Sequence, residues 1–351
     1  MRLLMTMVVR DEADIVEANL AFHVSAGVDF VLALDNGSRD GTTRILESYA
    51  ASGLLHLIRE PRIDIGRGES QTMLARLAAT EFDADWVVTA DADQFYWPRG
   101  GTLKGILEAV PERYGVVTAP RRVFVPRPSN EPFFADRMTV RLALENPIND
   151  PASPFRPQSN VVHRAHPSTV VAPGNRGVTG GRHIQLGGWY PIEVLHFPLR
   201  SLEQSEKKFV AANPGWLGNA VRAKALAAHK DGRFREYYEA VVVDDDQLAR
   251  GLVDGSLVVD TRLRDALSGI RDADGALSLL RDTERVPFES PSLEEQAAFG
   301  LELSVLRDAD LVRGQRRLDA LEVRVGALER GLGGALARRI RRFGARPGRR
   351  A

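Results

Sequence analysis

The chain of 351 residues contains no cysteine. This absence excludes disulfide bonds, thiolate metal sites and cysteine nucleophiles, although it does not fix the cellular compartment. Basic and acidic residues are equal in number, 47 of each, so the formal net charge is zero. Because no global basic field attracts phosphates, we expect no nucleic-acid partner.

Long apolar runs are also missing. The N-terminal run 1–9 is too short for a membrane-spanning helix and shows no signal-peptide cleavage site, and no other run approaches a span. The apolar content of 44% and charged content of 27% are ordinary for a soluble globular protein of one large or two smaller domains. We therefore expect a cytoplasmic protein that begins with a strand.

Two phosphate-binding motifs are absent as well. No G-x-G-x-x-G follows the first predicted strand, and G-x-x-x-x-G-K-[ST] occurs nowhere in the chain. A dinucleotide-binding domain and a P-loop NTPase are therefore both disfavoured.

Short apolar runs alternate with helical patterns in the N-terminal third. Strands are predicted over 3–9, 29–34, 54–59 and 86–90, with a fifth over 116–119 after a change of pattern. Alternation at this spacing predicts a mostly parallel α/β sheet with helices on both faces. In such sheets the ligand lies at the carboxyl ends of the strands.

Acidic residues follow three of these strands. They form the pairs Asp11/Glu12, Asp35/Asp40 and Asp91/Asp93. If the strand continues past Ala90, alternation places Asp91 and Asp93 on one face, where two like charges need a cation between them. Carboxylate oxygens at such a position suit Mg²⁺ or Mn²⁺ bridging a diphosphate, and a solvated loop is the alternative.

Three motifs in this order resemble those of family 2 glycosyltransferases of GT-A fold, over residues 3 to about 100. The motifs are Val9-Arg10-Asp11-Glu12-Ala13, Leu34-Asp35-Asn36-Gly37-Ser38-Arg39-Asp40-Gly41-Thr42 and Asp91-Ala92-Asp93-Gln94-Phe95. The chain departs from the family at Gln94, where an acidic residue is common. On a continuing strand, Gln94 is predicted to point away from the face of Asp93.

The resemblance implies a role for each matching residue. Glu12 and Asp35 would lie beside the nucleoside, and Asp91 would face the ribose or the metal-bound waters. Asp93 would coordinate the Mn²⁺ or Mg²⁺ that clamps the donor diphosphate. Arg10 and Arg67 are candidate donor-binding cations, although Arg67 is equally well a solvated loop residue.

His196 lies at the end of a predicted strand, where GT-A enzymes often place a third metal ligand. A structural histidine is the alternative. Inverting transfer also needs a carboxylate base for the acceptor hydroxyl. Asp136 and Glu145 are the candidates in the irregular, Pro- and Arg-rich region 120–157, and Glu193 is in reach by position. His163, His166 and His183 are weaker candidates for acceptor or phosphate contacts.

The remainder of the chain is mostly helical by pattern. Residues 244–246, three aspartates, are interpreted as a helix cap rather than a metal site. Farther on, Leu311, Leu318, Val325 and Leu332 are spaced by seven, with Leu321 and Leu328 between them. This spacing favours a short coiled coil and a homo-oligomer, and a helix folded back on the domain is the alternative. The last residues, 338–350, hold seven arginines and no acid, as expected of a solvated tail or a contact with anionic lipid.

These observations predict four regions. A GT-A nucleotide-sugar-binding and catalytic domain spans 1–200, a helical extension 201–290, a long amphipathic helix or coiled coil 291–337, and a basic tail 338–351. The expected function is metal-dependent transfer of a hexose from a nucleotide-sugar donor to a glycan, lipid-linked or small-molecule acceptor, in the cytoplasm or at the inner face of the membrane. A sugar nucleotidyltransferase and a non-catalytic oligomeric scaffold are the alternatives.

Overall fold

The computed structural model describes residues 1–61, 66–143, 158–181, 184–186, 189–211, 220–270, 315 and 318–328. It divides the chain into two compact units, Met1–Ala297 and Ala298–Ala351. The first unit contains the sheet and the candidate site.

Strands and helices of the first unit follow one another along the chain. The strands are β1 Leu3–Val9, β2 Phe30–Asp35, β3 Leu55–Arg59, β4 Trp86–Ala90, β5 Gln94–Pro98, β6 Tyr114–Val123, β7 Val140–Leu142, β8 Ser159–Arg164, β9 Val170–Val171, β10 Val178–Thr179, β11 Ile184–Leu186, β12 Ile192–His196 and β13 Leu257–Val259. The helices are α1 Val16–Ser25, α2 Thr42–Ala51, α3 Arg67–Thr80, α4 Leu103–Glu108, α5 Phe134–Arg137, α6 Leu202–Ala211, α7 Ala220–Lys230, α8 Phe234–Glu239, α9 Asp245–Val253 and α10 Arg262–Ser268.

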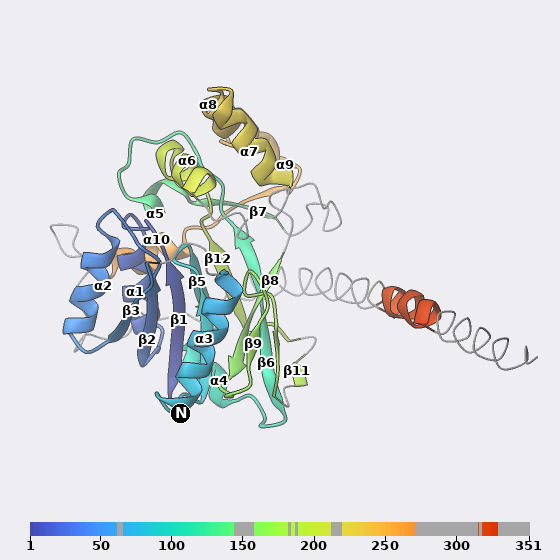
Figure 1. The fold of residues 1–351 in the computed structure, drawn as a ribbon. Helices are drawn as coiled ribbons and strands as arrows, with labels where there is room; N and C mark the ends of the chain where they lie inside the picture. Colours follow the sequence, from blue (N-terminus) through green and yellow to red (C-terminus); the bar gives the residue numbers. More distant parts are fainter. Residues whose placement is uncertain are drawn as a thin grey trace, which may run out of the picture. The chain divides into compact units, whose positions relative to one another are not determined.

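One half of the main sheet is parallel, as the sequence predicts. In the order β3-β2-β1-β4, each strand runs parallel to its neighbour, and the carboxyl ends of all four lie at the same edge (Figure 1). The three acidic pairs follow β1, β2 and β4. They therefore gather at one edge of the sheet, where α/β proteins bind ligands.

The other half of the sheet is mixed, and it curls. From β4 the order continues β8-β6-β12-β5, with β8 antiparallel to both neighbours and β5 antiparallel to β12. Only three residues, 91–93, join β4 to β5, although the two strands lie at opposite ends of this half. The sheet must therefore bend round until β5 returns beside the end of β4.

Helices cover both faces of the parallel half, as expected. On β1, the alternate residues Leu3, Met5 and Met7 pack into the larger core together with α1. Leu4 and Val8 point to the other face and pack into a second core with α3. Side chains that alternate along a strand point to opposite faces, so an uninterrupted apolar run is what a strand buried on both sides requires.

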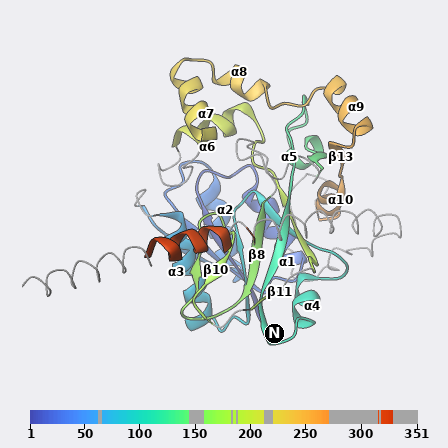
Figure 2. The same cartoon turned by 90° about the vertical axis from the view of Figure 1, so that its right-hand side faces the viewer.

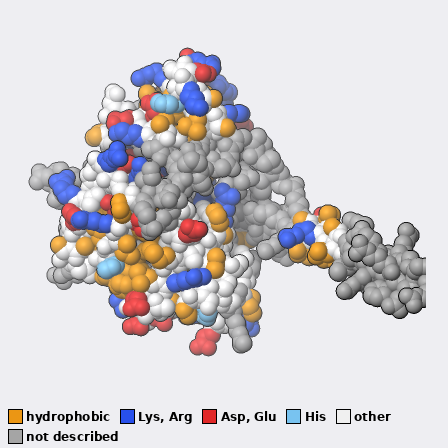
Figure 3. All heavy atoms as spheres, in the orientation of Figure 1, with side chains coloured by type: hydrophobic (Ala, Val, Ile, Leu, Met, Phe, Trp, Pro, Cys, Tyr) orange, Lys and Arg blue, Asp and Glu red, His pale blue; other side chains and the backbone are white. Residues whose placement is uncertain are grey.

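A group of helices lies beyond the carboxyl edge of the sheet. In both views α6, α7 and α8 stand at the end opposite the N-terminus of β1 (Figures 1 and 2). Leu199, Phe209, Ala225 and Phe234 form a small separate core among them. Charges of both signs cover the outside (Figure 3), including the exposed pairs Arg233–Asp231 and Arg235–Glu239.

Several details differ from the sequence-based expectation. Asp91 and Asp93 lie in the turn before β5 and not on a continuing strand, because β4 ends at Ala90. The region expected to be irregular from residue 120 begins with the end of β6 and later contains α5 and β7. Asp244 caps α9 through a reciprocal capping box with Gln247, which confirms the interpretation of the triple aspartate as a cap.

The second unit is described over a short helix only. Residues 318–328 are helical, and Leu318, Leu321, Val325 and Leu328 are exposed. Leu311, Leu332 and the arginine-rich segment 338–350 lie outside the described residues. Across the described parts of the chain, we find no helix with the length and apolar character needed to span a membrane.

Candidate functional site at the carboxyl edge of the sheet

The loops that follow β1 and β2 are tied together by hydrogen bonds. The backbone N–H of Asp11 donates to Ser38 Oγ at 3.0 Å, and that of Glu12 donates to Thr42 Oγ1 at 2.9 Å. In the other direction, the N–H of Arg39 donates to Asp11 Oδ1 at 2.7 Å. The first two acidic pairs therefore belong to one rigid wall at the sheet edge.

Asp35 is buried in this wall. Its Oδ1 accepts from the Ser38 N–H at 2.9 Å, and its Oδ2 accepts from Thr43 Oγ1 at 2.5 Å. Both oxygens thus shape the Asp-Asn-Gly-Ser loop, and each keeps lone-pair capacity for one further donor. Asn36 beside it is also buried and holds the Glu60 carbonyl at 3.1 Å.

A buried asparagine on α1 fixes the turn between β4 and β5. The Asn19 side-chain amide donates to the Ala92 carbonyl at 3.0 Å and to the Gln94 carbonyl at 2.8 Å. One turn later on α1, His23 accepts from the Tyr96 N–H at 3.1 Å. The turn that carries Asp91 and Asp93 is therefore held by helix α1, whose contacting residues lie more than 70 positions earlier in the sequence.

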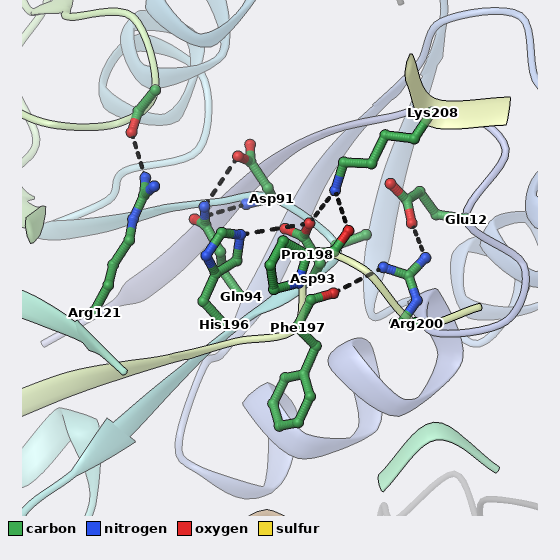
Figure 4. A network of polar contacts seen from close by, with 12 residues as sticks. Glu12, Asp91, Asp93, Gln94, Arg121, His196, Phe197, Pro198, Arg200 and Lys208 are labelled. Carbon is green, nitrogen blue, oxygen red and sulfur yellow. Dashed lines mark hydrogen bonds and ion pairs between the residues drawn. The ribbon is translucent and has the colours of Figure 1, made fainter. Parts of the chain in front are cut away.

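Asp91 is held from both sides by side-chain amides. Gln94 Nε2 donates to Asp91 Oδ2 at 3.1 Å, and Asn175 Nδ2 donates to Oδ1 at 3.2 Å. Gln94, drawn beside Asp91 in Figure 4, in turn accepts from Asn160 at 2.7 Å, and Asn160 accepts from Arg121. Gln94 therefore orients Asp91 with its amide, in the position where the resemblance makes an acid common.

Asp93 is the centre of the site. It is only 4% exposed, yet its Oδ2 accepts a hydrogen bond from Lys208 Nζ and lies 3.6 Å from His196 Nε2 (Figure 4). The register of β12 against β5 pairs His196 with Gln94 and thereby brings the imidazole to the turn. The Phe197 N–H also donates to the Asp93 carbonyl at 2.9 Å.

The charges around Asp93 decide its ionisation. Burial alone would raise the pKa of Asp93, but Lys208, His196 and Arg200 together outweigh it and hold that pKa well below its ordinary value. Burial lowers the pKa of His196 below 6.5, and Asp93 only partly opposes this. At neutral pH the site therefore presents a carboxylate next to a neutral imidazole, the forms in which both side chains bind metals.

Arg200 braces the other side of the site. Its guanidinium is fully buried and donates to both oxygens of Asp14, at 2.7 and 2.8 Å, to Glu12 and to the Phe197 carbonyl. Burial raises the pKa of Glu12, and Arg200 and Lys208 offset it only in part. Arg200 thus connects the loop after β1 to the end of β12.

A second buried acid, Glu193, lies three residues before His196 on β12. Its Oε1 contacts Arg122 at 2.5 Å and Arg99 at 3.1 Å, and its Oε2 accepts from Arg262 at 2.8 Å. Burial opposes ionisation of Glu193, but these three arginines hold its pKa far below the ordinary value. A carboxylate held in this way is a poor proton acceptor, so its environment does not suit a catalytic base.

Comparison with protein families gives one match. Residues 16–167 match the model described as glycosyl transferase family 2. Over this segment, which is less than half of the chain, the sequence is similar to glycosyl transferase family 2. Together with the helix-covered mixed sheet, the match confirms the GT-A fold expected from the sequence. The family 2 segment includes Asp35, Asp91 and Asp93, whereas Glu12, His196 and Lys208 lie outside it.

Solved structures of glycosyltransferases also align with the chain. One is glucosyl-3-phosphoglycerate synthase from Mycobacterium tuberculosis, in complex with Mn²⁺, UDP and glucosyl-3-phosphoglycerate; it is 23% identical over 34% of this chain and 44% of that one, with a TM-score of 0.26. Another is S. aureus TarS 1–349 with UDP-GlcNAc, 12% identical over 68% of this chain and 71% of that one, with a TM-score of 0.33. The chain thus covers less than half the length of the first. No curated protein sequence matches it.

The side chains around the turn between β4 and β5 provide some, but not all, of the ligands that a divalent cation needs. Asp93 Oδ2 and His196 Nε2 lie 3.6 Å apart, and the Lys208 ammonium already pairs with the same carboxylate oxygen. A stand-in cation at this position shows that the site accommodates positive charge. Among the described residues, however, no three His, Asp or Glu side chains gather into a complete metal site, so a cation bound here would need further ligands such as water.

The other predicted site residues do not all lie at this edge, since His163 pairs with Val87 near the amino end of β4. Arg10 follows β1, with its Nε 3.7 Å from Asp11 Oδ2. Arg67 begins α3, and Asp136 lies on α5, next to Phe134, which packs against Phe95 and Phe197. Glu145 and His183 fall outside the described residues. His163 is buried in the sheet, 3.4 Å from Thr89 Oγ1, and His166 accepts from the Ser168 N–H at 3.1 Å.

Three residues of the site escape sequence reasoning. Asn19, Arg200 and Lys208 belong to none of the three motifs, and each acts across a long sequence separation. Arg200 has one local signal, since it follows His196-Phe197-Pro198 at the end of a predicted strand. Lys208 looks like any surface lysine of an amphipathic helix, and only the fold places it on Asp93.

Proposed function

We propose that the chain is a metal-dependent glycosyltransferase that moves a hexose from a nucleoside-diphosphate donor to a hydroxyl acceptor, with inversion. The observation that supports this most directly is the buried, ionised Asp93 at the carboxyl end of β4, paired with a neutral histidine and a single lysine. A stable carboxylate at the ligand edge of the sheet is suited to binding a cation.

In this proposal Asp93 and His196 hold Mn²⁺ or Mg²⁺ and share its remaining positions with the donor. The bound cation would offset the negative charge that develops on the leaving diphosphate. Asp91, fixed by two amides, accepts a hydrogen bond from the ribose. Arg10, Glu12, Asp35 and Arg67 are the further donor-binding residues proposed along the loops after β1 and β2 and at the start of α3.

The transfer itself needs one base. As the acceptor oxygen forms its bond to the anomeric carbon, the bond from that carbon to the diphosphate breaks and the acceptor proton passes to a carboxylate. We propose Asp136 or Glu145 for this role. The position of α5 supports Asp136, because Phe134, two residues earlier on the same short helix, packs on Phe95 of β5 and on Phe197 after β12, which flank the turn of Asp93.

The second unit supports one additional proposal. Leucines exposed on the helix 318–328 continue the spacing of seven found in the sequence, which favours pairing of two copies of the chain through this segment. Such a homo-oligomer is compatible with catalysis in the first unit. Cytoplasmic location and a membrane contact of the arginine-rich tail remain predictions of the sequence.

A thermal-shift panel tests the donor site. UDP, GDP and dTDP are each added with and without Mn²⁺ to the wild type and to Asp93→Asn. One nucleotide at about a hundred times its Kd should stabilise the wild type by about 2.7 kcal/mol, in a metal-dependent way that the variant loses. If no nucleotide shifts the melting temperature under any condition, the edge is not a nucleotide site and the scaffold alternative gains support.

A further inference from the structure

Lys208 occupies the cation position of the candidate site. It lies on α6, in the helix group beyond the sheet edge, and its Nζ donates to Asp93 Oδ2 and to the Pro198 carbonyl at 3.2 Å (Figure 4). His196 Nε2 approaches the same carboxylate oxygen at 3.6 Å. The ammonium and the imidazole therefore meet at the same oxygen of Asp93, inside the candidate metal site.

A metal and this ammonium cannot share that oxygen at low cost. Both are positively charged, and the carboxylate is only 5% exposed, so solvent screens their repulsion poorly. Metal binding by Asp93 and His196 therefore requires Lys208 Nζ to leave. By contrast, the arginine that braces the site cannot move easily, since Arg200 is fully buried and holds Asp14 and Glu12 at once.

The side chain of Lys208 can move its ammonium away from Asp93. Its side chain is 26% exposed, and its ammonium sits on a flexible four-carbon stem with two acceptors, one of them a backbone carbonyl. Rotation of this stem moves the charge without unfolding α6. Because α6 stands over the same edge, the displaced ammonium stays beside the place where the donor's phosphates would lie (Figure 1).

We propose that Lys208 is an exchangeable cation: it neutralises Asp93 in the donor-free protein and moves to the donor's diphosphate when the metal and donor bind. This inference rests on the function proposed above and adds a donor-binding residue to it. Each charge has a partner in both the donor-free and the donor-bound protein. The metal replaces Lys208 on Asp93, and the diphosphate that arrives with the metal becomes the new anionic partner of Lys208. Metal and donor therefore bind together.

The first test measures metal binding without nucleotide. Mn²⁺ alone is titrated into the wild type and Lys208→Met, and free Mn²⁺ is followed by its electron paramagnetic resonance signal. Methionine keeps much of the stem but carries no charge, so Lys208→Met should bind Mn²⁺ at least about tenfold more tightly, because no cation has to be displaced. Equal Mn²⁺ affinity of the two proteins would overturn the competition.

The second test measures nucleotide binding with Mn²⁺ present. Calorimetric titration of UDP, GDP and dTDP should show about tenfold weaker binding of the preferred nucleotide to Lys208→Met, since the diphosphate loses an ammonium contact. Lys208→Arg, which keeps the charge, should retain part of that affinity. Unchanged nucleotide affinity in Lys208→Met would contradict the transfer of Lys208 to the diphosphate.

Lys207→Met is the matched control. Lys207 is the adjacent residue on α6, is 65% exposed and pairs with Glu203, so the variant makes the same charge change without removing a contact to Asp93. It should bind Mn²⁺ and nucleotide like the wild type, and far-ultraviolet circular dichroism checks that each variant is folded. Suppose that the wild type binds Mn²⁺ and nucleotide and that Asp93→Asn binds neither. If Lys208→Met then binds both as the wild type does, only the Lys208 proposal fails. If the wild type binds no nucleotide, the proposed function fails.

Discussion

Two buried carboxylates on neighbouring segments, Asp93 and Glu193, have opposite surroundings. Glu193 is enclosed by the guanidinium groups of three arginines, and Arg262 is in turn held by Asp260 with hydrogen bonds at 2.9 and 2.7 Å. Asp93 has one lysine, a quarter exposed, and a neutral histidine. Both acids are ionised, but only Asp93 has partners that can be exchanged for a ligand.

The comparison shows what separates a structural charge from a binding charge. Arg122 is fully buried and has planar, multiple contacts to Glu193, so loss of either partner leaves a charge without compensation. Lys208 can turn its ammonium into solvent if Asp93 is lost or occupied. The first arrangement fixes α10 to the sheet, and the second would allow the cation and diphosphate of the proposed function to replace the lysine.

The largest expected effect is on stability at Glu193. Glu193→Gln keeps the shape of the side chain but leaves buried guanidinium groups without their shared anion, so the free energy of unfolding should fall by about 3–5 kcal/mol. Asp93→Asn should cost less than about 1 kcal/mol, because it also removes the desolvation cost of a buried carboxylate. Urea denaturation of both variants measures the difference. Equal losses would show that the two acids are structurally equivalent.

His23 is a third buried ionisable group, and it extends the comparison because no charged residue contributes to the shift of its pKa. His23 accepts from the Tyr96 N–H and bonds the Asn19 carbonyl, and burial lowers its pKa from 6.5 to about 4. Between these two pKa values, the His23 imidazole therefore binds a proton in the unfolded chain but not in the folded chain. Stability from this group is complete above about pH 6.5 and is lost as the pH falls towards 4.

The corresponding variant is His23→Gln, which retains one donor and one acceptor. The gap between 6.5 and about 4, at about 1.4 kcal/mol per pH unit, corresponds to about 3.5 kcal/mol, of which about 3 kcal/mol is lost by pH 4. The advantage of the wild type over His23→Gln in unfolding free energy should shrink by that amount between pH 7 and pH 4. His229→Gln, which changes an exposed histidine, should show no comparable loss. A constant difference across this range would falsify the assignment of a neutral buried imidazole.

The sequence predicts the parallel half of the fold well for a physical reason. Strands β1 to β4 are short apolar runs separated by helical periodicity, and both signals are local. The end of β4 is different. Asn19, 73 positions earlier in the sequence, donates to the Ala92 carbonyl in the turn after β4, and no pattern near Asp91 indicates this bond.

The candidate site shows the same division between local sequence signals and long-range contacts. Asp35, Asp91 and Asp93 lie in motifs at strand ends, so their common edge follows from parallel pairing. Lys208 and Arg200 reach the site only because β12 pairs with β5 and the chain then turns into α6. Long-range pairing of this kind leaves no periodic trace in the sequence, and the partners of Asp93 could not be deduced from its own neighbourhood.

The last expected effect concerns Gln94, the position at which the sequence departs from the pattern of family 2 glycosyltransferases. Gln94 donates to Asp91 Oδ2 at 3.1 Å, so Gln94→Glu places two buried carboxyl groups in contact and raises the pKa of one of them. A raised folded-state pKa means that stability present at low pH is lost as the pH rises. The variant should therefore match the wild type near pH 4 and unfold with about 1–3 kcal/mol less free energy at pH 8. Because Mn²⁺ relieves repulsion between acids, adding Mn²⁺ with nucleotide should recover part of this loss. A pH-independent loss would instead indicate disrupted packing around Asn160, and no loss at all would mean that the amide of Gln94 does not orient Asp91.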